Sequence, residues 1–326
     1  MKYIKIFNQL SKSDIGIAGG KGASLGELIK IGVPVPAGFV ILAPAFDRFL
    51  KETKLDVEIQ AQLDKVNLDD INSVNNCSQT IRGLIDNFEM PADLQKETEK
   101  SYWLLVDRGG KKHKNQFVAV RSSATAEDSS TAAWAGQLDS YLYTSSNNLL
   151  SNVKKCWSSL FTERAIFYRF EKKLHQSPVS VAVVVQKMIN SEISGVCFTV
   201  HPITKDRKQM VIETCYGLGE ALVGGIITPD TYVVGKPEIL NSKPEIIEKN
   251  ISDQEKKIVY KSGGGTKEAK VPRQTRDKQK LSDEKILELA RICQQIEKHY
   301  GLPQDIEFAI ENSKIYIVQS RPITTL

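Results

Sequence analysis

The sequence predicts an α+β fold arranged in two lobes, and three observations lead to that prediction. Residues 44–105 show the apolar periodicity of successive helices. The second half of the chain instead contains short apolar runs that are typical of strands. Close to the end, Ile306 and Phe308 take one face of an extended segment, while Asp305 and Glu307 take the other. Helices and antiparallel strands that are segregated along the chain indicate α+β rather than alternating β–α units.

Length and composition are those of an ordinary globular protein. The chain has 326 residues, 41% hydrophobic and 25% charged, with a net charge of +5, and this length suits two domains. A mildly basic chain fits anionic small ligands as well as nucleic acid, so the charge decides little. Five cysteines without a Cys-x-x-Cys pair argue against a disulfide framework or zinc site and favour a cytoplasmic location. The densest apolar run, 181–185, is too short to cross a bilayer.

The elements expected in the first half follow from these patterns. In order, they are a strand over 3–7, a glycine-rich turn over 16–22, a helix over 23–31, a strand over 39–42, helices across 44–105, a basic loop over 108–114, a strand over 117–120 that leads into Arg121, and a helical segment over 149–170 interrupted near Ser158. The boundary between the lobes is expected between 185 and 190, which gives lobes of 1–185 and 186–326.

The second half is expected to be dominated by strands. They are predicted over 181–187, 195–200, 210–215 and 231–234, with weaker strands near Glu245 and Ile258, a charged loop over 263–280, a helix over 281–300 and a final hairpin from 306–310 and 315–318. Ser282 is the expected N-cap of the long helix, and Gly301 is expected to end it.

A glycine-rich stretch near the start is a candidate phosphate site. Residues 19–24 combine three glycines with Lys21 just before a predicted helix. Glycines let backbone amides approach an anion, and the helix N-terminus adds a favourable dipole. The spacing is not that of a Walker A loop. An ordinary strand-to-helix turn would have the same composition.

The segment around Arg121 is the most unusual part of the sequence. An apolar strand leads to this arginine, and three hydroxyl side chains and the carboxylates of Glu127 and Asp128 follow. An arginine at a strand end suits the bidentate binding of phosphate. Small residues around Trp134 and Gly136 suit a mobile flap. The alternative is a capped surface turn with an ordinary salt bridge.

The final hairpin is a candidate magnesium site. A three-residue loop, 312–314, would pair Glu307 with Gln319 and Asp305 with Arg321, whereas a two-residue loop would place Glu307 opposite Val318. We therefore predict the three-residue loop, with one residue in the left-handed region forming a bulge. A carboxylate and an amide oxygen on one face suit magnesium, which keeps several waters. The alternative is a solvated face of cross-strand polar pairs.

Two further segments are weaker candidates. The apolar strand over 181–188 ends at Gln186 and Met188, and its backbone edge could hydrogen-bond an adenine between two lobes. Such a run is more often plain core. Glu213 and Glu220 flank Gly217 and Gly219 and are candidate second metal or ribose contacts, although tight packing explains the glycines as well.

Taken together, these motifs resemble the nucleotide domain of the pyruvate,water dikinase family, which includes phosphoenolpyruvate synthase, rifampin phosphotransferase and pyruvate phosphate dikinase. The resemblance rests on G-G-K-G-A-S-L-G-E-L, P-V-P-A-G-F, V-R-S-S-A-T-A-E-D, W-A-G-Q-L-D-S-Y-L, G-L-G-E-A-L-V-G-G, D-I-E-F and V-Q-S-R-P-I-T-T, which occur in the family's order. It runs nearly from end to end. It departs at Ser129 and Ser130, where Leu-Pro is common, and at Trp134, where Phe is common.

The resemblance implies an ATP-grasp fold whose two lobes clamp ATP, with magnesium bridging the phosphates. By motif position, the implied site is Lys21 and Arg121 on the phosphates, Gly136 and Ser140 in the flap, Gln186 with Met188 at the adenine hinge, Glu307 and Gln319 as magnesium ligands, Asp305 as a metal ligand or a residue behind one, and Arg321 on the phosphate being transferred. It also implies transfer of the β-phosphoryl group of ATP to a histidine on another domain.

The histidine that would accept this phosphate is not expected in this chain. His113, His175, His201 and His299 all lack the family's phosphohistidine surroundings, and His201 is expected to be structural. Phosphohistidine and acceptor domains are therefore expected in cis beyond Leu326 or in trans. Pyruvate, a rifamycin and a glucan remain open as final acceptors. A nucleotide-binding module without turnover and an ATP-grasp ligase remain alternatives. A nucleic-acid binder that uses the basic run 267–280 is disfavoured because the run lacks aromatic residues.

Overall fold

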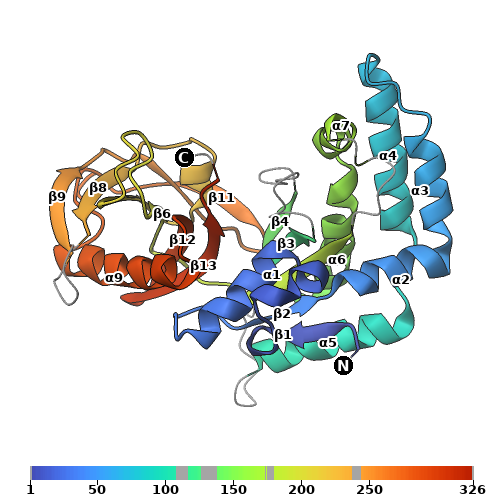
Figure 1. Ribbon diagram of the computed structural model, residues 1–326, viewed down its shortest axis with the longest axis horizontal. Coiled ribbons are helices and arrows are strands. Elements are labelled where there is room, and N and C mark those ends of the chain that lie inside the picture. Colours follow the sequence, from blue (N-terminus) through green and yellow to red (C-terminus); the bar gives the residue numbers. More distant parts are fainter. Residues whose placement is uncertain are drawn as a thin grey trace. The chain divides into compact units, whose positions relative to one another are not determined.

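The computed structural model describes residues 2–107, 117–125, 138–172, 174, 180–236 and 244–324. The chain divides into two compact units. Unit 1 comprises 1–27 and 37–188, and unit 2 comprises 28–36 and 189–326. Each unit has its own antiparallel sheet (Figure 1) and its own apolar core. The α+β prediction is confirmed.

The short segment 28–36 belongs to unit 2, although its neighbours on both sides belong to unit 1. Its packing explains the assignment. The backbone N–H of Ile317 donates to the carbonyl of Pro34 at 2.8 Å, and the side chain of Gln295 donates to the carbonyl of Ile31 at 2.7 Å. Leu28 and Val33 are buried in the core of unit 2. These contacts join residues far apart in sequence, so sequence periodicity does not reveal them.

Unit 1 contains a five-stranded sheet with helices packed on one face. Its strand order is β1 (Ile4–Ile6), β2 (Gly38–Ile41), β5 (Val181–Lys187), β3 (Val118–Ala124) and β4 (Ser140–Thr144). The helices are α2 (Ala43–Thr53), α3 (Leu55–Leu63), α4 (Ile71–Asn87), α5 (Ala92–Val106), α6 (Leu149–Ser158) and α7 (Glu163–Glu171). Fully buried Trp157 anchors this layer, with ring centroids 5.5 Å from Phe46 and 5.2 Å from Phe49.

Unit 2 contains a six-stranded sheet covered on one face by a long helix. Its strand order is β13 (Lys314–Pro322), β12 (Gln304–Glu311), β6 (Ile193–Phe198), β7 (Gln209–Tyr216), β8 (Asp230–Gly235) and β9 (Glu245–Asn250). The helix is α9 (Asp283–Tyr300), and its apolar stripe packs on Ile212, Ile306 and Phe308. As predicted, the Ser282 hydroxyl caps its start by accepting from the N–H of Lys285, and Gly301 ends it at φ 69°. A short helix, α8 (Glu220–Val223), was not predicted.

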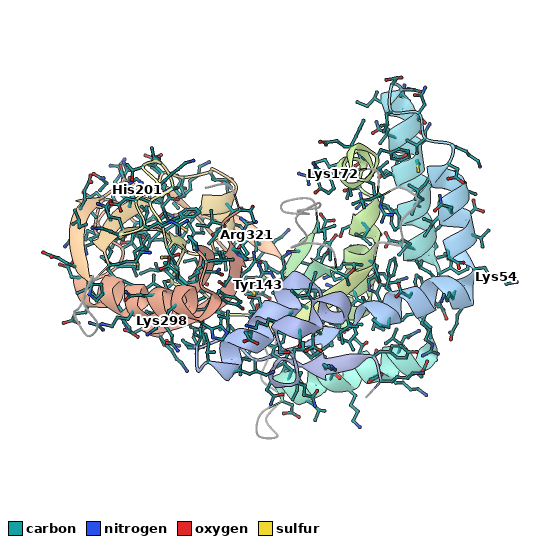
Figure 2. All side chains as sticks on the ribbon, in the orientation of Figure 1. Lys54, Tyr143, Lys172, His201, Lys298 and Arg321 are labelled. Carbon is teal, nitrogen blue, oxygen red and sulfur yellow. The ribbon has the colours of Figure 1, made fainter. Side chains whose placement is uncertain are left out.

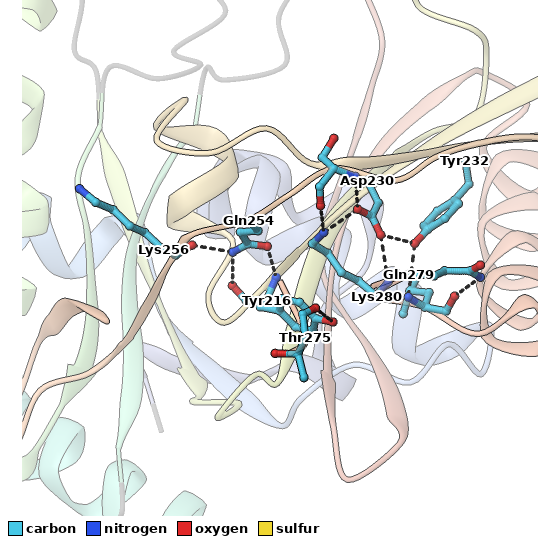
Figure 3. A network of polar contacts seen from close by, with 10 residues as sticks. Tyr216, Asp230, Tyr232, Gln254, Lys256, Thr275, Gln279 and Lys280 are labelled. Atoms are coloured by element: carbon cyan, nitrogen blue, oxygen red, sulfur yellow. Dashed lines mark hydrogen bonds and ion pairs between the residues drawn. The ribbon is translucent and has the colours of Figure 1, made fainter. Parts of the chain in front are cut away.

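The predicted charged loop over 263–280 is wrong in part, because it contains a strand. β10 (Lys256–Tyr260) and β11 (Thr266–Lys270) form a two-stranded arm. A buried network holds its base (Figure 3). Lys280 Nζ lies 2.5 Å from Asp230 Oδ1, and both side chains are fully buried. Asp230 Oδ2 also accepts from the hydroxyl of Tyr232 at 2.8 Å. The strand was missed because β11 is polar apart from Ala269 and is defined by its pairing with β10 rather than by apolar residues.

No helix in the described ranges combines the length and the apolar character needed to cross a lipid bilayer.

Candidate functional site

The glycine-rich stretch folds as a kinked helix rather than as the predicted turn over 16–22. α1 (Ile15–Lys30) is helical on both sides of Gly19, which alone departs from helical geometry at φ 67° and ψ 170°. A positive φ of this kind is accessible to glycine at little cost. The turn prediction was too long because the flanking glycines, Gly16 and Gly20, remain helical. Lys21 therefore lies in the first turn of the helix that restarts after the kink.

Arg121 lies inside strand β3 rather than at its end, which corrects the prediction. The strand continues to Ala124, and Arg121 is paired with Val184 of β5 and Ser140 of β4. Ser140 is the first residue of a strand that the sequence did not indicate. Trp134 and Gly136 of the expected flap, and Glu127 and Asp128 of the Arg121 segment, lie outside the described residues.

The register of this sheet places several candidate residues on one face. Arg121 pairs with Val184, and Gln186 pairs with Ala119 two positions along, so all four point to the same side. The opposite side packs on the helical layer through Val120, Val183 and their neighbours. The part of α1 that follows the kink crosses the Arg121 side, because a Cβ on Gly22 would lie 3.0 Å from the side chain of Val40, which pairs with Val184. The kink at Gly19, Arg121 and Gln186 therefore share the face of the sheet that lacks the helical layer.

Gln186 is 2% exposed, and its side-chain Nε2 has no hydrogen-bond partner within the described part of the chain. Buried amide groups without a partner are rare, and each one needs an explanation. The predicted role for the backbone edge here is contradicted. β5 is an interior strand, and the N–H groups of Lys187 and Met188 already donate to Ala37 and Phe117. A ligand on this segment would instead meet the Gln186 side chain.

The hairpin of unit 2 has the predicted pairs but not the predicted loop. Glu307 lies opposite Gln319, and Asp305 lies opposite Arg321, as predicted. The loop has two residues, Asn312 and Ser313, both with positive φ. A register shift between Glu307 and Phe308 leaves Val318 as the extra residue of a β-bulge. The loop prediction was wrong because it placed the extra residue in the turn, whereas the structure places it within β13.

A row of side chains, all polar except Val196, crosses this sheet on the face opposite α9. Gln319, Glu307, Val196, Glu213 and Thr231 are successive cross-strand partners on five strands. Glu213, which the sequence marked only weakly, therefore shares a face with Glu307. Burial raises the pKa of Glu213 above its ordinary value. Glu220 lies at the start of α8 and is exposed, outside this row.

Asp305 and Arg321 form an ion pair at the end of the hairpin. Arg321 Nη2 and Nε donate to Asp305 Oδ2 at 2.7 and 2.9 Å, and Arg321 is labelled in Figure 2. Burial raises the pKa of Asp305, the guanidinium of Arg321 opposes that shift, and the nearby Glu307 carboxylate adds to it. A cation bound near Asp305 would stabilise the ionised form of its carboxyl group.

The structure gives the two described histidines structural contacts. His201, labelled in Figure 2, accepts from the backbone N–H groups of Ile203 and Thr204 through Nδ1, at 3.3 Å each. This loop contact fits the structural role predicted for it. His299 packs edge-on against Tyr300. His113 and His175 lie outside the described residues.

The comparison with known proteins decides the family. The family described as the pyruvate phosphate dikinase AMP/ATP-binding domain matches residues 15–326. This chain belongs to that family. It is 46% identical over its whole length to a probable phosphoenolpyruvate synthase of Methanocaldococcus jannaschii, covering 27% of that protein. It is 44% identical to a probable phosphoenolpyruvate synthase of Methanothermobacter thermautotrophicus, covering 46% of it. It is 39% identical over 98% of its length to a rifampicin phosphotransferase of Bacillus subtilis, covering 36% of it.

The family assignment confirms the predicted resemblance. The chain spans between about a quarter and a half of the length of these relatives. The roles of the individual site residues are not tested by it and stay predictions.

Proposed function

We propose that this chain binds magnesium-ATP and supplies the phosphoryl group for a dikinase-type phosphotransferase. The observation that carries the proposal is the gathering of candidate residues on one sheet face in each unit. In unit 1 the Gly19 kink, Arg121 and Gln186 share a face, and the buried Gln186 amide lacks a hydrogen-bond partner among the described residues. In unit 2 Glu307, Gln319 and Glu213 share another.

The proposed phosphate contacts come from unit 1. Lys21 supplies a point charge at a helix N-terminus, and Arg121 supplies a planar guanidinium on β3. Charge spreads over oxygens in the transition state of phosphoryl transfer, so fixed cations stabilise it. Ser140, opposite Arg121, and Gly136 are proposed parts of the cover over these phosphates. Gln186, with the segment through Met188, is proposed to contact the adenine.

The proposed magnesium ligands come from the hairpin of unit 2. Glu307 and Gln319 offer a carboxylate and an amide oxygen from paired positions, and Asp305 lies one cross-strand row away. No group of three or more His, Cys, Asp or Glu side chains in the described ranges is arranged to hold a metal. Magnesium keeps several waters and takes phosphate oxygens as ligands, so the few oxygens of the hairpin are proposed to be its protein ligands. Magnesium would neutralise charge on the phosphates, while Arg321 would orient the phosphate that is transferred.

The acceptor is proposed to be a histidine on a further domain, in cis or in trans. The relatives named phosphoenolpyruvate synthase and rifampicin phosphotransferase are longer than this chain, which leaves room in them for such domains. The final acceptor is left open. We propose a cytoplasmic protein without nucleic-acid or membrane partners. Free cysteines suit a reducing compartment, and the basic run 267–280 lacks the aromatic residues on which bases would stack.

Calorimetric titration with magnesium-ATP tests the site assignment. Arg121→Ala and Glu307→Ala are each expected to weaken ATP binding by about tenfold or more, since charge-assisted contacts contribute about 1.5–3 kcal/mol. Arg48→Ala is the control, because Arg48 pairs with Asp93 on the helical face of unit 1. Unchanged affinity in both site variants would refute the assignment.

Product analysis separates the proposal from its alternatives. With a phosphohistidine domain supplied, AMP and a phosphorylated histidine are expected. ADP as the product would indicate a ligase-type activity, and ATP binding without any product would indicate a binding module. Both of these results would contradict the proposed transfer.

A further inference from the structure

Ser123 connects the two phosphate-binding segments of unit 1. Its hydroxyl donates to the carbonyl of Ala18 at 2.9 Å and accepts from the backbone N–H of Gly22 at 3.2 Å. These two partners lie on either side of the Gly19 kink, and Gly22 is 101 residues away from Ser123 in sequence. The Ser123 side chain is fully buried. One hydroxyl therefore bridges both sides of the kink.

The approach of strand β3 to the kink is as close as a glycine permits. A Cβ built on Gly19 would lie 2.2 Å from Ser123 Oγ and 2.3 Å from the Ser123 carbonyl oxygen. Non-bonded atoms do not approach this closely, so any larger residue at position 19 would push the kink away from β3. Two properties of Gly19 thus permit the close contact with Ser123: it has no Cβ, and it adopts a positive φ.

The chemistry of the contact resembles that of a helix cap. The first amides of a helix have no acceptor within the helix, and side-chain oxygens often accept from them. Here the accepting oxygen comes from a different strand, and it takes the N–H of Gly22 just after Lys21. This fixes the direction of the peptide units around Lys21.

The position of Ser123 on β3 ties the same contact to Arg121. Residues two apart on a strand point to one face and are separated by roughly 6.6 Å. Arg121 and Ser123 are such a pair. Arg121 therefore lies two residues along β3 from Ser123, and the Ser123 hydroxyl holds the helical turn that carries Lys21. Together these two links fix how far the Arg121 backbone lies from that turn.

We propose that Ser123 is a positioning residue that holds the Gly19 kink and the helical turn after it, through Gly22, against strand β3, so that Lys21 and Arg121 meet the same polyphosphate. This inference rests on the proposed function, since it assumes that both cations bind ATP. Ser123 itself needs no contact with the nucleotide.

The neighbouring serine offers a matched control. Ser122 is equally buried, but it points to the other face of β3. Its hydroxyl lies 3.0 Å from the Ser159 hydroxyl and shares its single hydrogen between the carbonyl oxygens of Asp139 and Cys156, at 3.0 and 3.2 Å. Ser122 thus connects the strand to the helical layer. Ser122→Ala removes the hydrogen bonds of one buried serine, as Ser123→Ala does, but leaves the contacts of the Gly19 kink unchanged.

A double-mutant cycle on ATP affinity tests the proposal, with thermal unfolding measured in parallel. Ser123→Ala is expected to weaken ATP binding about tenfold, as for residues coupled through direct contact. Ser122→Ala is expected to lower the unfolding temperature while changing the ATP affinity less than twofold. In a Lys21→Ala background, Ser123→Ala is expected to have little further effect, because the group that it positions is gone.

The outcomes separate the inference from the proposed function. If Lys21→Ala alone leaves the ATP affinity unchanged, the phosphate-binding role that the proposed function gives to Lys21 is refuted. If Lys21→Ala weakens binding but Ser123→Ala does no more than Ser122→Ala, or if the two losses are fully additive, the positioning role is refuted. Should Ser123→Ala not fold, Ser123→Cys keeps a weak donor of similar size. Its affinity is expected to lie between wild type and Lys21→Ala, and wild-type affinity would overturn the proposal.

Discussion

The two units build their candidate sites in different ways. In unit 1 the site residues come from three segments, around Gly19, Arg121 and Gln186, which only the tertiary structure brings to one face. In unit 2 Glu307 and Gln319 lie on neighbouring strands of a single hairpin. A hairpin site is set by local pairing and is therefore readable from alternation. A site assembled from distant segments depends on contacts such as that of Ser123 with Gly22, which alternation does not reveal.

The largest expected effect tests whether unit 2 also depends on a long-range contact. Lys280→Ala would leave Asp230 buried without its cation, and breaking a buried pair in this way destabilises a protein by about 3–5 kcal/mol. Urea unfolding followed by fluorescence measures the loss. The control is Arg276→Ala, which breaks solvent-exposed pairs with Asp253 and Glu255 and should therefore cost much less stability than Lys280→Ala. Equal losses in the two variants would show that the Asp230 network does not hold the arm.

The next effect tests the close contact in unit 1. Gly19→Ala puts a Cβ against Ser123 at a positive φ, so we expect a loss of stability of at least about 2 kcal/mol together with weaker ATP binding. Gly16→Ala is the matched control. Gly16 lies in the same helix, and a Cβ there would meet nothing within 4 Å. Alanine at this position should therefore stabilise the protein by about 0.5–1 kcal/mol. If both variants were neutral, the kink would not require glycine.

A pH series tests the row of polar residues in unit 2. The pKa of Glu213 is raised by burial, so the unfolded chain releases this proton at lower pH than the folded chain does. The contribution of protonated Glu213 to the free energy of unfolding is therefore lost as the pH rises from about 4.5, the ordinary pKa of this group, through its raised pKa. Glu213→Gln should remove this slope and become relatively more stable above that range. Thermal unfolding between pH 4 and 8 measures it, with Glu245→Gln on the exposed strand β9 as control. Parallel curves for wild type and Glu213→Gln would contradict the shift.

The smallest effect concerns the hairpin turn. Asn312 and Ser313 both have positive φ, the geometry that favours Asn-Gly in two-residue loops. Ser313→Gly should therefore raise the free energy of unfolding by about 1 kcal/mol, because glycine adopts a positive φ without the steric cost that serine bears, and should leave ATP affinity unchanged. Ser313→Val should lower stability instead. Chemical denaturation resolves the order, and a destabilised glycine variant would argue against this turn.

Much of the fold was predictable because it rests on local signals. The caps of α9, the helical layer over 44–105 and the strand 181–187 all follow from side-chain chemistry within a few residues. β11 was missed because it is mostly polar and only its partner strand defines it, whereas β4, with Tyr141 and Tyr143, was missed because it is short and was interpreted as part of the flap. The pairing of Glu307 with Gln319 was predicted, yet for the wrong reason, since the bulge lies at Val318 and not in the turn.

By itself, the sequence determined the fold class, the order of most elements, the family and the residue types available for phosphate and metal binding. Propensity, capping and alternation act over short distances along the chain, so they are visible in it. The tertiary structure decided that Gly19 kinks against Ser123, that Glu213 joins the row of Glu307, and that residues 28–36 pack with unit 2. These features depend on cross-strand register and on close packing between segments far apart in the chain, which no local pattern encodes.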